Sequence, residues 1–232
     1  GASPRSDRGL RDDLDRARRG GAPRVLRLLR VDDQPAHFAG AGMDAKLNED
    51  FRDLIKQGLG RGPFGRAFHG LPGIVLSLVA RTIPRLIVEP PLRARVVNTG
   101  APAFLLGPDG LPGGAPFAEG AVLHEGPVTI VAASTVTQYA RGLTFFPFAD
   151  RIGERFQLRV SSAGAREVLP HLPSIFAGTY RNAEKLHDFS ATSVRIELSP
   201  RGPVHVGGDL WGHRDALSIG LDPRTVVLLC RA

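Results

Sequence analysis

The chain has 232 residues, a length typical of one large domain or two small ones. Apolar residues make up 42% and charged residues 23%, which is the composition of a folded globular protein and not of a disordered one. The 28 glycines and 19 prolines disfavour a helical bundle and favour many turns. The longest apolar run, residues 73–80, is too short for a bilayer span, which needs about 20 residues. A single cysteine, Cys230, excludes a disulfide framework.

The formal net charge of +7 is concentrated near the N-terminus, where residues 1–30 hold nine arginines and four aspartates. A basic segment of this kind favours an anionic partner such as a phospholipid surface, nucleic acid or phosphate. Aromatic residues make up only 6% of the chain, so base-stacking platforms are scarce and nucleic acid is disfavoured as the partner. A solvated linker is the other interpretation of residues 1–23. Lacking a hydrophobic leader, the sequence leads us to expect a cytoplasmic protein that is peripheral to the membrane.

The first predicted elements are two short strands within residues 24–42, joined by a turn at residues 32–35. A helix follows, with Asp44 as its expected N-cap, Leu47, Phe51 and Leu54 at helical spacing, and Gly58 at its end. A second helical zone is expected over residues 64–83. Its apolar side chains favour core packing, and the alternative is a lipid cleft.

From residue 84 the pattern changes to strands. Residues 85–90 (RLIVEP) predict a short strand, and apolar residues alternate with polar or charged ones at period two in residues 92–96, 156–160 and 194–198. Further strands are expected at residues 128–133, 204–206 and 225–230, with a short interrupted helix at 166–176. Residues 100–127 are rich in glycine and proline and predict a long loop with one strand at most. Residues 145–148 (FFPF) favour core packing.

The predicted fold class is therefore mainly β: an antiparallel two-sheet β-sandwich with a helical insertion near its N-terminal side. Residues 24–232 form this domain, and residues 1–23 form a basic linker or arm. Strands and helices do not alternate regularly, which argues against a doubly wound parallel sheet.

Most catalytic signatures are absent from the sequence. It has no GxxxxGK[ST] phosphate loop, no GxSxG elbow and no HExxH pattern among its seven histidines. One segment stands out, residues 204–214 (VHVGGDLWGHR), where a strand runs into Gly207 and Gly208, then Asp209 and the only tryptophan. A carboxylate at such a turn acts as a general base if it reaches a substrate hydroxyl. The alternative is an ordinary β-hairpin turn in which the aspartate caps the backbone.

Four passages together resemble the C-terminal domain of the diacylglycerol, sphingosine and ceramide kinase superfamily of lipid kinases. Residues 39–45 (AGAGMDA) resemble its strand-to-helix junction, and Asn98 followed by the Gly113–Gly114 segment resembles its asparagine-containing strand end. Residues 124–128 resemble an acidic turn, and residues 207–212 (GGDLWG) resemble the family's DGE turn. The resemblance covers residues 25–230.

The resemblance implies that Asp209 is the general base for phosphoryl transfer to a lipid hydroxyl, with Asn98, Gly113, Gly114, Gly207 and Gly208 lining the substrate cleft. It also implies that ATP and Mg²⁺ bind a nucleotide-binding domain of the same protein, whose GGDGT signature is not in this sequence. Without that domain the isolated chain is expected to bind no cofactor and to show no turnover. No metal ligand is assigned.

Two departures from the family pattern support an alternative function. Gly207 stands where the family has its first acid, and Asp209 is one methylene shorter than the family's glutamate. A misplacement of about 1 Å can cost on the order of 100-fold in rate. The alternative is a non-catalytic lipid- or membrane-binding module with the same fold. Under either hypothesis the expected partners are a lipid and an anionic membrane surface.

Overall fold

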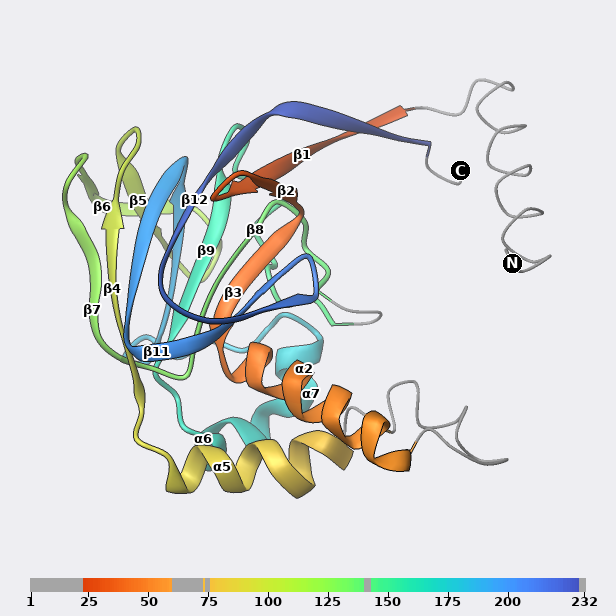
Figure 1. Ribbon diagram of the computed structural model, residues 1–232. Helices are drawn as coiled ribbons and strands as arrows, with labels where there is room; N and C mark the ends of the chain where they lie inside the picture. Colours follow the sequence, from red (N-terminus) through yellow and green to blue (C-terminus); the bar gives the residue numbers. More distant parts are fainter. Residues whose placement is uncertain (1–22, 60–72, 74–75, 140–142, 230–232) are drawn as a thin grey trace.

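The computed structural model describes residues 23–59, 73, 76–139 and 143–229. Twelve strands dominate it: β1 (Pro23–Val31), β2 (Gln34–Ala36), β3 (Phe38–Gly42), β4 (Leu92–Asn98), β5 (Ala103–Leu106), β6 (Pro112–Phe117), β7 (Val122–Val128), β8 (Ile130–Ser134), β9 (Phe156–Ser161), β10 (Leu186–Ala191), β11 (Ser193–Val206) and β12 (Asp209–Leu229). The helices are α2 (Met43–Leu54) with η1 (Ile55–Leu59), η2 (Leu78–Thr82) with α5 (Ile83–Val88), and α6 (Ala165–Val168), η3 (Leu169–His171) and α7 (Leu172–Phe176). The mainly β fold with an early helical insertion is confirmed (Figure 1).

The strands form two layers that are joined through β11. One layer has the order β2-β1-β12-β11-β4-β7, and the other has the order β3-β8-β9-β10-β5-β6; each of these pairings is antiparallel. The first part of β11 pairs with β4 and its last part pairs with β3, while β12 follows it along the other edge. The hydrogen bonding is therefore continuous, and the sandwich is one large sheet folded on itself.

The core lies between the two layers. It contains Val194, Ile196 and Leu198 from β11, packed in one cluster with inward-facing residues of the opposite layer such as Leu158 and Val160. The period-two alternation of residues 194–198 places their apolar members here and turns Arg195 and Glu197 toward solvent. The FFPF segment also packs as predicted, because Phe146 and Phe148 are buried.

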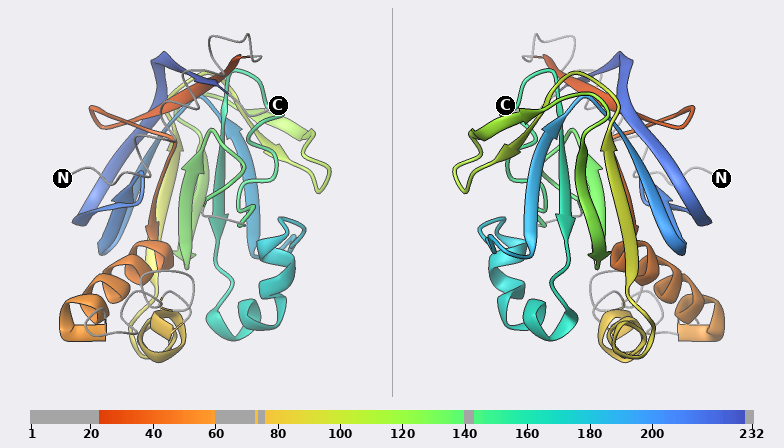
Figure 2. Two further views of the ribbon diagram at one scale, coloured as in Figure 1. Left: turned by 90° about the vertical axis from the view of Figure 1, so that its right-hand side faces the viewer. Right: turned by 90° about the vertical axis from the view of Figure 1, so that its left-hand side faces the viewer.

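The helices of the described residues lie at one end of the strands, and the β5–β6 hairpin lies toward the other end (Figure 2). A charged cluster joins α2 to α5: Arg85 contacts the buried Asp50 at 2.6 Å, and Thr82 donates to the same carboxylate at 2.8 Å. No helix among the described residues has the length and apolar character needed to cross a membrane.

Two predicted elements differ in the structure. Residues 85–90 were expected to form a strand, but residues 83–88 are helix α5. Pro84 suits the first turn of a helix, and Arg85 pairs with Glu89 at 2.9 Å one turn later and with Asp50 on α2. These contacts override the strand propensity of the apolar run.

The glycine- and proline-rich stretch 100–127 is not a long loop. It contains β5, β6 and most of β7, and it is ordered by backbone pairing with β10 and β4. β11 and β12 are also longer than expected, because residues 193–206 form one strand and β12 begins at Asp209. The predicted arm and most of the helical zone 64–83 lie outside the described residues.

Candidate functional site

The Gly207–Gly208 turn joins β11 to β12. Val206 pairs with Asp209 across it, so the connection has only two residues, with φ of +59° and +91°. Positive φ at both central positions is the mark of a type I′ hairpin turn, which glycine adopts without steric cost. The hairpin turn named in the alternative interpretation of this segment is therefore present. The amide of Gly207 also donates to the carbonyl of Phe38 at 2.8 Å, which fixes the turn to β3.

The turn rests on one face of α2. The side chain of Asn48 donates to the carbonyl of Gly208, and Nη2 of Arg52 lies 3.0 Å from Oδ1 of Asp209. The side chain of Asp209 is 83% exposed, so its carboxylate is open to solvent on the sides that Arg52 does not cover. Asp44, Asn48 and Arg52 follow one another at four-residue spacing, which places all three on the face of α2 that meets the hairpin.

Beneath the turn, three polar side chains from distant parts of the chain meet. Oδ2 of Asp44 lies 2.6 Å from Nε2 of His205 and accepts a hydrogen bond of 2.6 Å from the hydroxyl of Tyr139. Asp44 and His205 are both buried, and Nδ1 of His205 has no hydrogen-bond partner among the described residues. Gly40 makes room for this cluster, because a Cβ there would lie 2.9 Å from Oδ2 of Asp44.

The cluster changes the pKa of two of its members. Burial raises the pKa of Asp44, but the charge and hydrogen bond of His205, the Tyr139 hydroxyl and the Ala45 amide together lower it below the usual 3.8. Burial, followed by the charge of Asp44, raises the pKa of Tyr139 well above 10. Asp44 is therefore a buried carboxylate and Tyr139 a neutral donor at neutral pH.

Asp44 does not have the role expected from the sequence. It was predicted as the N-cap of the first helix, but that position is Gly42, and Asp44 lies within the first turn. Its Oδ1 accepts from the amide of Ala45 at 2.8 Å, while Oδ2 takes part in the buried cluster. An acid in the first turn still interacts favourably with the helix dipole.

Asn98 lies at the other end of β11 from Asp209. It pairs with Val194, whereas Asp209 pairs with Val206, so the two residues do not share a rim. Asn98 is fully buried, and its amide nitrogen lies 3.0 to 3.4 Å from the carbonyl oxygens of Gly100, Ala101, Phe117 and Ala118. These contacts hold the connections around β5 and β6 together.

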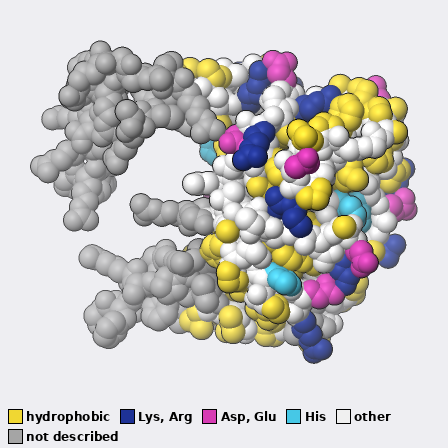
Figure 3. Space-filling model, turned by 180° about the vertical axis from the view of Figure 1, so that it is seen from behind, with side chains coloured by type: hydrophobic (Ala, Val, Ile, Leu, Met, Phe, Trp, Pro, Cys, Tyr) yellow, Lys and Arg dark blue, Asp and Glu magenta, His cyan; other side chains and the backbone are white. Residues whose placement is uncertain are grey.

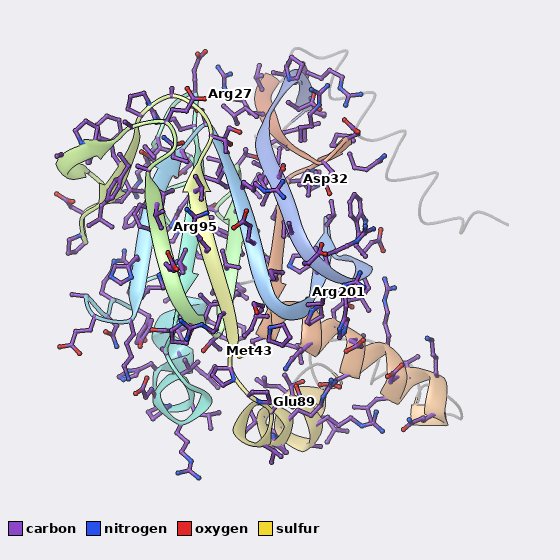
Figure 4. The ribbon with its side chains drawn as sticks, turned by 60° about the vertical axis from the view of Figure 1, so that its left-hand side comes forward. Arg27, Asp32, Met43, Glu89, Arg95 and Arg201 are labelled. Atoms are coloured by element: carbon purple, nitrogen blue, oxygen red, sulfur yellow. The ribbon has the colours of Figure 1, made fainter. Side chains whose placement is uncertain are left out.

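Gly113 and Gly114 lie in the exposed strand β6, where Gly113 is level with Leu105 of β5. Gly114 has a φ of +71° and open space where a side chain would be. Of the predicted site residues, the structure therefore brings Gly207, Gly208 and Asp209 together, and it places Asn98, Gly113 and Gly114 elsewhere. The acidic turn residue Glu125 is on β7, with Oε2 3.6 Å from Nε of Arg95 on the exposed side of β4 (Figure 4).

Two adjoining cavities open at the helical end, on another side of α2. The first, of about 50 Å³, lies between the β8–β9 pair and α6–α7, and its lining includes Ile130, Phe145, Val168 and Ile175. The second, of about 170 Å³, is lined by residues that include Lys46 and Glu89, which form an ion pair. Met43 and Thr129 line both, and Figure 4 shows Met43 and Glu89 at this end of the molecule. Asp209 lines neither cavity.

Within the described ranges, no three His, Cys, Asp or Glu side chains are grouped to hold a metal ion. The glycines with positive φ near the candidate base form a hairpin turn rather than a phosphate loop that leads into a helix.

The fold has solved counterparts. A structure described as a putative diacylglycerol kinase from Bacillus anthracis str. Sterne matches 87% of this chain with a TM-score of 0.50 and 15% identity. Two further diacylglycerol kinase structures from the same source match 86% and 87% of the chain, with TM-scores of 0.48 and 0.49 and identities of 11% and 15%. The chain adopts a diacylglycerol kinase-like fold. It spans about half the length of these structures, 51% to 55% of each.

Neither a protein-family model nor a curated protein sequence matches the chain. The solved structures confirm, at the level of fold, the similarity that the sequence motifs indicate. The identity of 15% to the structure with the highest of these TM-scores carries no information on activity.

Sequence reasoning missed two members of the buried cluster, His205 and Tyr139. His205 is part of the VHVGGD segment, and its place between two valines of a strand resembles an ordinary core position. Tyr139 lies in an irregular segment with no periodicity. The sequence feature that could have drawn attention to Tyr139 is that the chain has only two tyrosines.

Proposed function

We propose that this chain is the substrate-side domain of a lipid kinase of the diacylglycerol and sphingosine type. In this proposal a nucleotide-binding domain of the same protein supplies ATP and Mg²⁺, and the present chain binds the lipid and accepts the proton of its hydroxyl group. The enzyme then transfers the γ-phosphoryl group to that hydroxyl.

The proposal is supported mainly by the way the strand-to-helix junction and the Gly207–Asp209 turn meet in space. These two motifs are about 160 residues apart in the sequence, and they are joined by the bond from Asn48 to Gly208 and by the Asp44–His205 contact. A fold that brings together the two segments picked out by the lipid kinase resemblance is expected if both serve one site. The diacylglycerol kinase-like fold agrees with this.

Asp209 is assigned the role of general base. Its carboxylate is exposed, its turn is fixed to β3 and α2, and Arg52 lies beside it. Because Asp209 lines neither cavity of the helical end, the reacting hydroxyl approaches it from the exposed side of the hairpin.

Two observations favour the second candidate, a lipid-binding module without catalysis. Gly207 lacks the acid of the family's turn, and the carboxylate of Asp209 is engaged by Arg52. The turn has space for the missing acid, since a Cβ at Gly207 would meet no atom within 4 Å. The two functions differ in whether substitution of Asp209 is predicted to lower phosphoryl transfer. Both require binding of the lipid.

Binding of a soluble short-chain diacylglycerol to the present chain tests the shared part of the proposal. We expect saturable chemical-shift changes in residues near the β11–β12 turn, and no change in melting temperature on addition of ATP and Mg²⁺. The matched control ligand is the corresponding triacylglycerol, which lacks the free hydroxyl. Equal binding of both ligands, or binding of ATP by this chain alone, would contradict the assignment as a substrate-side domain.

A further inference from the structure

Half of the exposed large hydrophobic side chains of the described residues lie on the helical segments. The ten exposed side chains are Leu76 in the helical turn just before η2, Val79, Val88, Leu169 and Phe176 in the helical segments, and Val25, Leu111, Val122, Val226 and Val227 in the strands or their connections. Val88 is the most exposed at 84% and is the last residue of α5. Single exposed apolar residues are common on protein surfaces, so their shared location is the informative feature.

These five residues lie at one end of the molecule. Leu76 and Val79 are three residues apart, a spacing that places them on one side of their helix. α5 contacts α6, and Leu169 and Phe176 come from the η3 and α7 segments that continue α6. Figure 3 shows hydrophobic side chains, close to basic ones, at the surface along the lower edge of the molecule. We call these five residues the helical apolar face.

The charges around the helical apolar face suit an anionic partner. The glutamates beside these helices are engaged by cations: Glu49 and Glu89 by Arg85, Glu89 also by Lys46, and Glu167 by Lys185. Arg81 and Arg166, in contrast, contact no carboxylate within the part of the chain that the structure describes. Isolated apolar side chains together with arginines that lack carboxylate partners are suited to a phospholipid surface.

The openings of the two cavities add a second line of support. The lining of the smaller cavity includes Val168 and Ile175 of the α6–α7 segment, and that of the larger one includes Glu89 and Pro90 next to Val88. Both cavities therefore border the segments that carry the helical apolar face. A face that meets a bilayer places these openings at the lipid surface.

We propose that the helical apolar face is the surface by which this protein docks on an anionic phospholipid bilayer. This inference rests on the proposed function, because it names the membrane face of a domain that acts on a lipid. Val88, Val79 and Leu169 enter the headgroup region, and Arg81 and Arg166 contact lipid phosphates. The α2–β12 side that carries Asp209 does not take part in docking.

The test is sedimentation of the chain with phosphatidylcholine vesicles that do or do not contain phosphatidylserine, and that contain no diacylglycerol. Val88→Glu and Leu169→Glu should each weaken binding about tenfold or more, since each removes one buried apolar side chain from the contact. Arg81→Ala and Arg166→Ala should each weaken binding to the anionic vesicles about fivefold. The matched controls, Val25→Glu and Leu111→Glu, carry the same change at exposed apolar positions elsewhere and should bind as the unchanged chain does.

A spectroscopic measurement tests the same face without relying on a variant that binds vesicles less tightly. In a Trp211→Phe background, the fluorescence of Val88→Trp should shift to shorter wavelength on anionic vesicles and be quenched by brominated lipid, while that of Leu111→Trp should not. Equal behaviour of the helical and control variants would overturn the proposal. So would absence of vesicle binding, or a monomer–dimer shift caused by Val88→Glu in sedimentation velocity, which would assign the face to a second copy.

Failure of this proposal is distinguishable from failure of the proposed function. The vesicles lack substrate, and Asp209→Asn should bind them as the unchanged chain does. Loss of diacylglycerol binding with intact vesicle docking contradicts only the function, and the reverse result contradicts only the docking face.

Discussion

Arg52 on α2 and Asp209 on β12, 157 residues apart in sequence, form an ion pair with Nη2 3.0 Å from Oδ1. The pair joins the helix of the strand-to-helix junction to the hairpin that carries the candidate base. Because Asp209 is 83% exposed, the contact is screened by solvent and contributes less than about 1 kcal/mol to stability. The pair is therefore better suited to orient a carboxylate than to stabilise the fold.

Asp209→Asn is expected to leave the free energy of unfolding within about 1 kcal/mol of the unchanged protein. Urea unfolding followed by circular dichroism measures this directly. Asp209→Glu should be equally stable. A loss of several kcal/mol for Asp209→Asn would identify the residue as a structural cap and contradict its assignment as a base.

Tyr139→Phe should destabilise the protein by about 1.5–3 kcal/mol at neutral pH, because it removes a hydrogen bond to the buried Asp44 carboxylate. Folding raises the pKa of Tyr139, so this stabilisation is complete below pH 10 and is lost as the pH rises toward the folded-state pKa. The measurement is unfolding free energy against pH. The difference between the unchanged protein and Tyr139→Phe should be constant from neutral pH to about pH 10 and shrink above it. Tyr180→Phe, the only other tyrosine, is the control, and an equal alkaline effect there would contradict the assignment.

Asp44 should produce the opposite pH dependence. Folding lowers its pKa below 3.8, so its contribution is present above that pH and disappears as the pH falls through the folded-state value. Asp44→Asn should therefore be less stable than the unchanged protein at neutral pH, and this difference should narrow in acid. A difference that persists unchanged at low pH would show that the lost packing, and not the charge, carries the effect.

Gly40→Ala should destabilise the fold by about 1–3 kcal/mol, because its new methyl group would lie 2.7 Å from Cβ of Ala132 and 2.9 Å from Oδ2 of Asp44. Gly164→Ala is the matched control, since a Cβ there meets no atom within 4 Å. Thermal unfolding compares the two variants. If both behave alike, Gly40 is not required for the close approach of β3, β8 and Asp44.

Asn98→Ala should destabilise the protein by about 1–3 kcal/mol, because buried carbonyl oxygens of two connections lose their donor. Asn48→Ala removes a bond to a single carbonyl and should cost less. Vesicle and diacylglycerol binding by the folded fraction of Asn98→Ala should be unchanged. A selective loss of lipid binding with normal stability would instead place Asn98 in the substrate cleft.

Local patterns predicted much of the fold. Period-two alternation identified β4, β9 and the first part of β11, and the apolar spacing around Leu47 and Phe51 identified α2. The elements that were missed depend on tertiary contacts. β5 and β6 have weak strand propensity and are ordered by pairing with β10 and with each other, and α5 is held by the contacts of Arg85.

The site was predictable only in part. The glycine pair before Asp209 indicated a hairpin with an exposed carboxylate, and the turn has that geometry. The meeting of Asp44, Tyr139 and His205 depends on three segments that are far apart in sequence, and no local pattern encodes it. The structure does not bring Asn98 and Gly113 to Asp209 as the expected substrate cleft requires, because β11 separates Asn98 from the hairpin along its length.

The most direct test of the proposed function is transfer of radiolabelled phosphate from ATP to diacylglycerol by the product of the complete reading frame that contains this chain. Asp209→Asn should lower kcat by about 10²- to 10⁴-fold, the usual effect of removing a positioned base, with an unchanged melting temperature. Asp53→Asn, which alters an exposed aspartate on α2, should retain full activity. Full activity of Asp209→Asn would contradict the proposed mechanism.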